Sequence, residues 1–398
     1  MKLFTAKNQA ATDKGIVVDD MILTKEMPTA AGSKMLEGYM SLFDAQAVTL
    51  LREAGYVLAG KADVGEFAFD LMGESSYNGP VVVDGHLQSA AAELVKSGEA
   101  TAAVVLDVNG APRRAAAQNG LVSIKPTYGT VSRFGTVPVA CSGECVSVMA
   151  PTAKECKVLL AALTGHDDKD GTSLSAELCE STKSTPATLK RVALLTSLCK
   201  DADAEVQAKL SAARQALTDA GVEVVEVEND IIALARSAWN ILMSAELCNN
   251  VSRYDGVKYG YRAKSFNGID ELYTNSRTEA FGKLLKCAIL FGSETLSTEN
   301  YMKVYDKALR TRRVIREAFD KLFEGFDAVL MPATSKMAYT VELVEKDPYL
   351  CFTENAYTAP ASVTGLPAVV AAGVQLMGKP FGENTLFAAA EILAKEGN

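Results

Sequence analysis

The chain has 398 residues, with 40 Lys and Arg against 49 Asp and Glu, so its formal net charge is −9. A composition that is 48% hydrophobic and 22% charged is that of a globular protein and excludes a disordered chain. The net negative charge argues against direct nucleic-acid binding. No apolar run approaches the roughly 18 residues of a membrane span, and the start of the chain has no apolar signal core. We therefore expect a cytoplasmic protein.

Short apolar runs alternate with amphipathic stretches, which is typical of α/β folds. The pattern predicts strands over 56–60, 101–108, 191–197, 222–228, 327–334 and 367–377, and helices over 46–54, 88–97, 152–165, 203–219 and from Asn384. A long helical region is expected over about 230–325, and 167–187 is the most loop-like stretch. We expect one α/β domain over 1–398, with a mixed twisted β-sheet flanked by helices and the 230–325 region as a helical elaboration.

One strand-to-helix connection carries several polar residues. The predicted strand over 101–108 meets the turn Asn109-Gly110 and then an Ala-rich stretch beginning at Ala111. An apolar strand followed by a Gly-containing turn predicts a helix start near Ala111. Asp107 and Arg113 flank this turn, and we expect them to pair and hold it.

Several segments match one family in order along nearly the whole chain. They are IVVDDMILTKEMPT (16–29), FDAQAVTLLREAGYVLAGKADVGEFAF (43–69), SIKPTYGTVSRFGTVPVA (123–140), SRYDGVKYGYRA (252–263), DAVLMPAT (327–334), TGLPAVV (364–370) and GVQLMGKPFGENTL (373–386). The chain resembles the amidase signature family, and within it the A subunits of tRNA-dependent glutamyl/aspartyl-tRNA amidotransferases. The resemblance implies a mixed twisted sheet flanked by helices. It also implies a truncated N-terminus, because the helices that usually precede the family's lysine strand are not recognisable.

The same resemblance locates the family's Ser–Ser–Lys triad. A neutral lysine takes a proton through a bridging serine, and the second serine attacks the amide carbon. The matching positions hold Asp19 for the lysine, Gly85 for the bridging serine and Ala111 for the nucleophile. The resemblance thus implies that no catalytic residue of the family triad is intact.

Other positions of the family site also differ. The glycine-rich oxyanion turn is reduced to Asn109-Gly110, and Pro112 removes a backbone donor just after it. The family acid of the late segment appears as Asn355, whereas Tyr259 matches the aromatic residue of the glutamine pocket. The residues expected around a degenerate cleft are Asp19, His86, Asp107, Asn109, Gly110, Arg113, Tyr259 and Asn355.

Two groups of residues leave alternatives open. If His86, Asp19 and Asp107 met in the cleft, they would form a new acid/base site or ligate a metal; otherwise they are polar fillers of a partly solvated cleft. Cys141 and Cys145 would form a disulfide, supply a nucleophile or remain spectators. We expect fillers and spectators, and no metal or cofactor, because the whole chain has only 2 histidines and no paired CxxC spacing.

Three functions compete. The first is a non-catalytic scaffold or regulatory partner, a pseudoenzyme that docks a protein like the B or C subunit of the amidotransferase. The second is an active amidase or amidotransferase A subunit that hydrolyses the glutamine amide for glutamyl-tRNA(Gln) or aspartyl-tRNA(Asn) amidation by an altered mechanism. The third is a small-molecule binding module that uses the old pocket for an unidentified ligand. Loss of the triad favours the first, which is our expectation.

Overall fold

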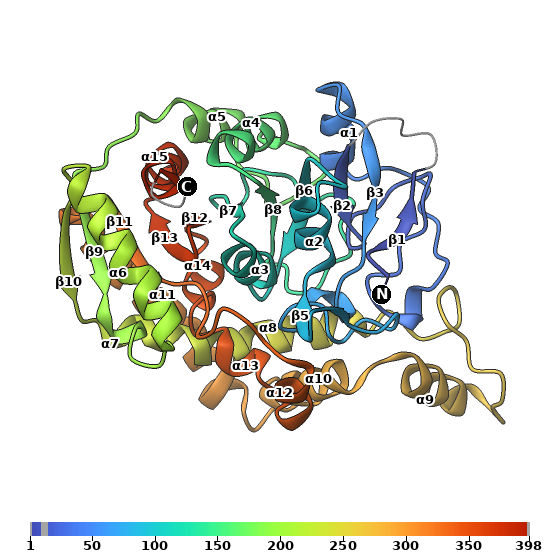
Figure 1. Cartoon of the computed structure of the whole chain (residues 1–398). Coiled ribbons are helices and arrows are strands. Elements are labelled where there is room, and N and C mark those ends of the chain that lie inside the picture. Colours follow the sequence, from blue (N-terminus) through green and yellow to red (C-terminus); the bar gives the residue numbers. More distant parts are fainter. Residues whose placement is uncertain (1, 9–14, 396–398) are drawn as a thin grey trace.

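An 11-stranded sheet forms the centre of the protein, seen here in a computed structural model that describes residues 2–8 and 15–395 (Figure 1). Its strands are β1 (Phe4–Lys7), β2 (Ile16–Asp19), β3 (Leu58–Ala62), β6 (Ala102–Asp107), β7 (Val122–Lys125), β8 (Cys145–Ala150), β9 (Arg191–Leu195), β10 (Glu223–Val227), β11 (Ala328–Pro332), β12 (Ala368–Ala371) and β13 (Val374–Gly378). β4 (Val81–Val83) and β5 (His86–Gln88) form a separate hairpin.

The helices fall between and after these strands. They are α1 (Gln46–Glu53), α2 (Ala90–Lys96), α3 (Ala111–Asn119), α4 (Ala153–Leu163), α5 (Ala176–Ser184), α6 (Ala204–Asp219), α7 (Asp230–Ala233), α8 (Ala235–Val251), α9 (Ile269–Ala280), α10 (Lys283–Thr295), α11 (Asp306–Gly325), α12 (Val341–Lys346), α13 (Cys351–Glu354), α14 (Ala359–Thr364) and α15 (Glu383–Ala394). Short 3₁₀ turns cover Lys34–Leu36, Glu66–Ala68 and Thr196–Leu198, and a π-helical turn covers Tyr301–Tyr305.

The sheet is mixed, as predicted. The strand order is β1-β3-β2-β6-β8-β7-β12-β13-β11-β9-β10. β2 runs parallel to β3 and β6, and β9 runs parallel to β10 and β11, whereas β8, β7, β12 and β13 join the two parallel groups through antiparallel pairs. Because β2, β3 and β6 are parallel, their carboxyl ends meet at one edge of the sheet.

Both faces of the sheet are buried at the central strand β6. Along β6, Val104 and Leu106 belong to one apolar cluster, whereas Ala103 and Val105 belong to another on the opposite face. This alternation follows from the period of two in a strand, and helices cover both faces as in other α/β folds. The segment Asp230–Val251 is long and apolar enough to cross a membrane by length and composition, but half of its most apolar window is buried inside the protein, and a core helix passes the same test.

Local signals predicted some boundaries well and others poorly. α4 begins at a capping box, where Thr152 Oγ1 accepts a hydrogen bond from the Glu155 N–H at 3.2 Å. The prediction of one strand over 367–377 is wrong, because the chain turns at Ala372 and Gly373 with φ of 50° and 83° and forms the antiparallel β12–β13 hairpin. The loop expected over 167–187 is also only partly right, because it contains α5.

Candidate functional site

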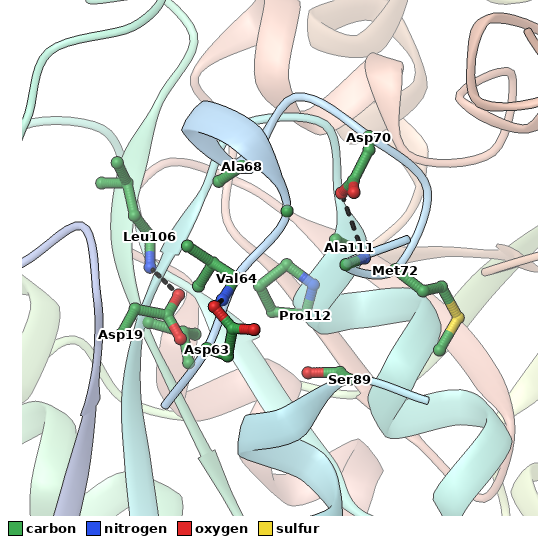
Figure 2. Close-up of a pocket in the computed structure, with 13 residues that line it drawn as sticks. Asp19, Asp63, Val64, Ala68, Asp70, Met72, Ser89, Leu106, Ala111 and Pro112 are labelled. Carbon is green, nitrogen blue, oxygen red and sulfur yellow. Dashed lines mark hydrogen bonds between the residues drawn. The ribbon is translucent and has the colours of Figure 1, made fainter. Parts of the chain in front are cut away.

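A small pocket lies at the carboxyl ends of β2, β3 and β6 (Figure 2). Asp19 is the last residue of β2, Asp63 follows β3, and Ala111 is the first residue of α3, just beyond β6. Ser89, the N-cap of α2, lines the same pocket, as does Pro112. Side chains distant in the sequence thus converge because three parallel strands end together.

The pocket is small. The centre of a water molecule can occupy about 30 Å³ of it, which is room for roughly two waters. Ligand pockets usually measure about 300–1,000 Å³. In this conformation the pocket has room for water and for no larger molecule, so it does not support a ready-made small-molecule binding module.

Asp19 is a buried acid. Its side chain is 5% exposed, and its Oδ2 accepts a hydrogen bond from the Leu106 N–H at 3.0 Å. Burial raises the pKa of Asp19 to about 8, and the neighbouring charge of Asp20 adds to this rise. The raised pKa favours the protonated, neutral form of Asp19 at pH 7.

Asp63 is the second acid of the pocket, and its surroundings differ. It is 5% exposed and accepts hydrogen bonds from Ser76 Oγ at 2.9 and 3.0 Å and from Asn78 Nδ2 at 3.1 Å. Burial raises the pKa of Asp63 to about 6, so it is mainly ionised at pH 7. Figure 2 shows the Asp19 and Asp63 carboxyl groups next to one another, and the charge of Asp63 contributes to the raised pKa of Asp19.

A buried lysine lies close to these acids but is already paired. Lys61 on β3 is 0% exposed, and its Nζ is 3.3 Å from Asp20 Oδ1. It also donates hydrogen bonds to the Pro28 carbonyl at 3.2 Å and to Thr29 Oγ1. The contact between Lys61 and Asp20 links β3 to the residue that follows β2. Lys61 does not line the pocket and therefore supplies no amine to it.

The predicted turn after β6 is confirmed. Arg113 Nε donates to Asp107 Oδ2 at 2.7 Å and Nη2 donates to Oδ1 at 3.0 Å, with both side chains 0% exposed. The Gly110 N–H, at φ 78°, donates to Asp107 Oδ1 at 3.1 Å. Asp107 and Arg113 therefore fix the start of α3 and do not line the pocket.

The alternative in which His86 meets Asp19 and Asp107 in the cleft is wrong. His86 lies in the β4–β5 hairpin and bridges to Thr340, and it does not line the pocket. Gly85, which the resemblance matches to the bridging serine, lies in the exposed turn of this hairpin with φ 81°. Among the described residues no group of three His, Cys, Asp or Glu side chains could hold a metal ion.

The other expected cleft residues also lie outside the pocket lining. Tyr259 is 41% exposed and its ring packs edge-on against Tyr254, with centroids 6.1 Å apart. Asn355 donates from Nδ2 to Asn240 Oδ1 at 2.7 Å. Asn109 donates from Nδ2 to the Phe69 carbonyl at 3.2 Å and so ties the turn to the segment that covers the pocket.

The cysteines form no disulfide, and all 8 are free thiols. Cys145 is buried and Cys141 is partly buried. Burial raises the pKa of both thiols, which lowers their thiolate fraction at neutral pH. Neither thiol therefore has the properties of an activated nucleophile.

An acidic segment that was not predicted from the sequence, residues 63–76, covers the pocket. Glu66 accepts from Ser33 Oγ at 2.7 Å, and burial raises its pKa to about 7. Burial also raises the pKa of Asp70 and brings that of Glu74 to about 8. The signal was available in DVGEFAFDLMGESS, where four acids recur around two glycines, but their burial depends on tertiary packing.

The family model described as Amidase matches residues 15–387, so the chain belongs to this family. The A subunit of glutamyl-tRNA(Gln) amidotransferase from Lachnoclostridium phytofermentans is 33% identical over 95% of this chain and 82% of its own length. The same protein of Streptococcus pneumoniae (strain 70585) is 34% identical over 94% of this chain and 81% of its own length. The crystal structure of the corresponding protein from Thermotoga maritima superposes with a TM-score of 0.80 at 27% identity, covering 99% of this chain and 87% of that one.

These relatives contradict the expectation of a non-catalytic scaffold. Each is named as the A subunit of an amidotransferase, which is a component of an enzyme complex. Our interpretation of the chain as a pseudoenzyme rested on the triad positions alone, and neither the relatives nor the intact fold around the pocket supports it. The second of the three hypotheses fits these findings better.

Proposed function

We propose that the chain is the A subunit of an amidotransferase and that it hydrolyses the side-chain amide of glutamine to release ammonia. The observation that carries this proposal is the acidic pocket at the ends of β2, β3 and β6, in a chain related over 94–95% of its length to such subunits. Asp19, at the position that the resemblance assigns to the catalytic lysine, lines this pocket.

The mechanism must differ from that of the family. Ala111, at the position of the family nucleophile, has a methyl group and cannot be acylated, and Gly85 supplies no hydroxyl from its surface turn. Asp19 is a proton donor at pH 7 where the family has a proton acceptor. The serine relay is therefore closed to this chain, and the pocket's own carboxyl groups are the groups available for proton transfer.

The substrate needs an opening in the segment 63–76. A glutamine side chain does not fit in a space of about 30 Å³, so this segment must move before the amide can reach Asp19 and Asp63. Such closing segments exclude water once substrate has bound and commonly carry strained backbone. Here Phe67 and Ala68 have φ of 54° and 51°, which is unusual for residues other than glycine.

The released ammonia would be used by partner proteins like the B and C subunits, which would amidate glutamyl-tRNA(Gln) or aspartyl-tRNA(Asn). With a net charge of −9, this chain lacks the general basic field that tRNA binding needs, so the partner would hold the tRNA.

Ammonia release tests the proposal. The full-length protein, alone and with B- and C-type subunits from the same organism, is assayed over a glutamine concentration series, with asparagine as a second substrate. We expect saturable ammonia release that Asp19→Asn abolishes, whereas Asp84→Asn, in the exposed β4–β5 turn, leaves it unchanged. Ammonia release by the wild type, alone and in the complex, no greater than that of a blank without this protein would contradict the proposal.

A further inference from the structure

We propose that Asp19 and Asp63 form a catalytic acid–base pair that directs a water molecule onto the amide carbon, without an acyl-enzyme. This inference rests on the proposed function and names the residues that would carry it out. It makes Asp63, which no family position suggested, a catalytic residue.

The first support is the geometry of the pocket. Both carboxyl groups are 5% exposed, line the same pocket and lie next to one another in Figure 2. Asp19 Oδ2 is held by the Leu106 N–H, while its other oxygen has no hydrogen-bond partner among the described residues. Because Asp19 lines a pocket with space for about two waters, its carboxyl group can accept a hydrogen bond from water or, when protonated, donate one.

The second support is the difference between the two acids. Their pKa values of about 8 and about 6 leave Asp19 protonated and Asp63 ionised at pH 7. Two nearby titratable groups with pKa values on either side of the working pH can serve as acid and base. Lys61 is paired with Asp20 at 3.3 Å, and the charge of Asp20 adds to the raised pKa of Asp63.

The reaction is balanced by these two groups. The Asp63 carboxylate takes a proton from water as the water oxygen bonds to the amide carbon, and Asp19 gives its proton to the amide oxygen. The tetrahedral intermediate then returns a hydroxyl proton to Asp19 while Asp63 protonates the amide nitrogen. The C–N bond breaks, which gives the carboxylic acid and ammonia and restores both aspartates to their starting states.

Ser89 is the competing nucleophile, because its hydroxyl lines the pocket and Ala111 has none. Its Oγ is the N-cap acceptor of α2 and lies 3.5 Å from the Ala92 nitrogen. Attack by Ser89 would form an ester that an added amine could intercept, whereas attack by water would not. This difference separates the two routes experimentally.

The test is the pH dependence of kcat/KM for ammonia release by the wild type, Asp19→Asn, Asp63→Asn and the control Asp84→Asn, with hydroxylamine added in a parallel series. We expect a bell-shaped wild-type profile with limbs near pH 6 and pH 8. Asp63→Asn should lose the acid limb and Asp19→Asn the alkaline limb, each with a loss of about 10²–10⁴-fold. Thermal unfolding of each variant verifies that it is folded.

Three results would overturn the inference. Formation of glutamyl hydroxamate that Ser89→Ala abolishes would show an acyl-enzyme on Ser89. Retention of the wild-type rate and profile by folded Asp19→Asn or Asp63→Asn would remove that residue from the reaction while leaving the proposed function intact. No ammonia release by the wild-type complex would instead remove the proposed function itself, and this inference with it.

Discussion

Replacing Arg113 by methionine should destabilise the protein strongly, because it leaves a carboxylate buried without its partner. Arg113 is 0% exposed and, besides Asp107, it donates to the Thr358 carbonyl at 2.9 Å and to Gln375 Oε1 at 2.8 Å. Removing one member of a buried pair costs about 3–5 kcal/mol. Total stabilities are about 5–15 kcal/mol, so Arg113→Met should remove a large fraction of the free energy of unfolding.

Urea unfolding followed by circular dichroism measures this loss. The control is Arg310→Met, because Arg310 pairs with Asp306 on the exposed face of α11 at 2.6 Å and should contribute little. The double variant Asp107→Leu/Arg113→Met should recover much of the loss, since it removes both charges. A single Arg113→Met loss no larger than that of Arg310→Met would refute the reasoning.

The pH dependence gives a second check on this pair. Burial by itself would raise the pKa of Asp107, but Arg113 outweighs it and the pKa lies below its usual value. A lowered folded-state pKa stabilises the protein above the unfolded-state pKa, near 4, and this stabilisation is lost as the pH falls through the folded value. The difference between wild type and Arg113→Met should therefore shrink in acid, below about pH 4.

Three further predictions follow from the site. Burial raises the pKa of Asp19 to about 8 and that of Glu66 to about 7 in the folded protein. Each group therefore contributes its full stabilisation of the folded state below the pKa of the unfolded chain, near 4, and this contribution is lost as the pH rises through the folded-state pKa. The free energy of unfolding in urea should thus fall between pH 5 and 8 by up to about 1.4 kcal/mol per pH unit for each group. Asp19→Asn should make this fall less steep. An unchanged slope in that variant would contradict the raised pKa of Asp19. Gly110→Ala should lower the melting temperature more than Gly120→Ala, although both glycines have positive φ. The new Cβ at Gly110 would lie 2.2 Å from Thr358 Cβ, whereas a Cβ at Gly120 would meet nothing within 4 Å. Equal melting temperatures of the two variants would contradict the close packing of Gly110 against Thr358. The variant Asp19→Lys/Gly85→Ser/Ala111→Ser should form no glutamyl hydroxamate, since Gly85 lies in an exposed turn outside the pocket lining, and hydroxamate at family-like rates would show that the serine relay had been rebuilt.

The sequence predicted those features that depend on neighbouring residues. The turn at Asn109-Gly110, the start of α3 at Ala111 and the pair of Asp107 with Arg113 all lie within a few positions of one another. A Gly-containing turn after an apolar strand carries its own signal, so local reasoning was sufficient. Asp19 was also found, because the family resemblance singled out its position.

The rest of the site depends on long-range pairing. Asp63 reaches the pocket because β3 runs parallel to β2, with Asp19 opposite Ala62, and no local pattern reports that register. The prediction that His86 lies in the cleft failed for the same reason, because His86 belongs to the β4–β5 hairpin and forms a β-bridge with Thr340. Burial, which makes Asp19 an acid at neutral pH, likewise appears only in the folded structure.

Ammonia release from glutamine at pH 7 by the complex with B- and C-type subunits, comparing wild type with Asp63→Asn, tests the central claim most directly. The account predicts saturable release by the wild type and a loss of about 10²–10⁴-fold in the folded variant, because the base of the reaction is gone. Equal release by both proteins, or none by the wild type, would contradict it.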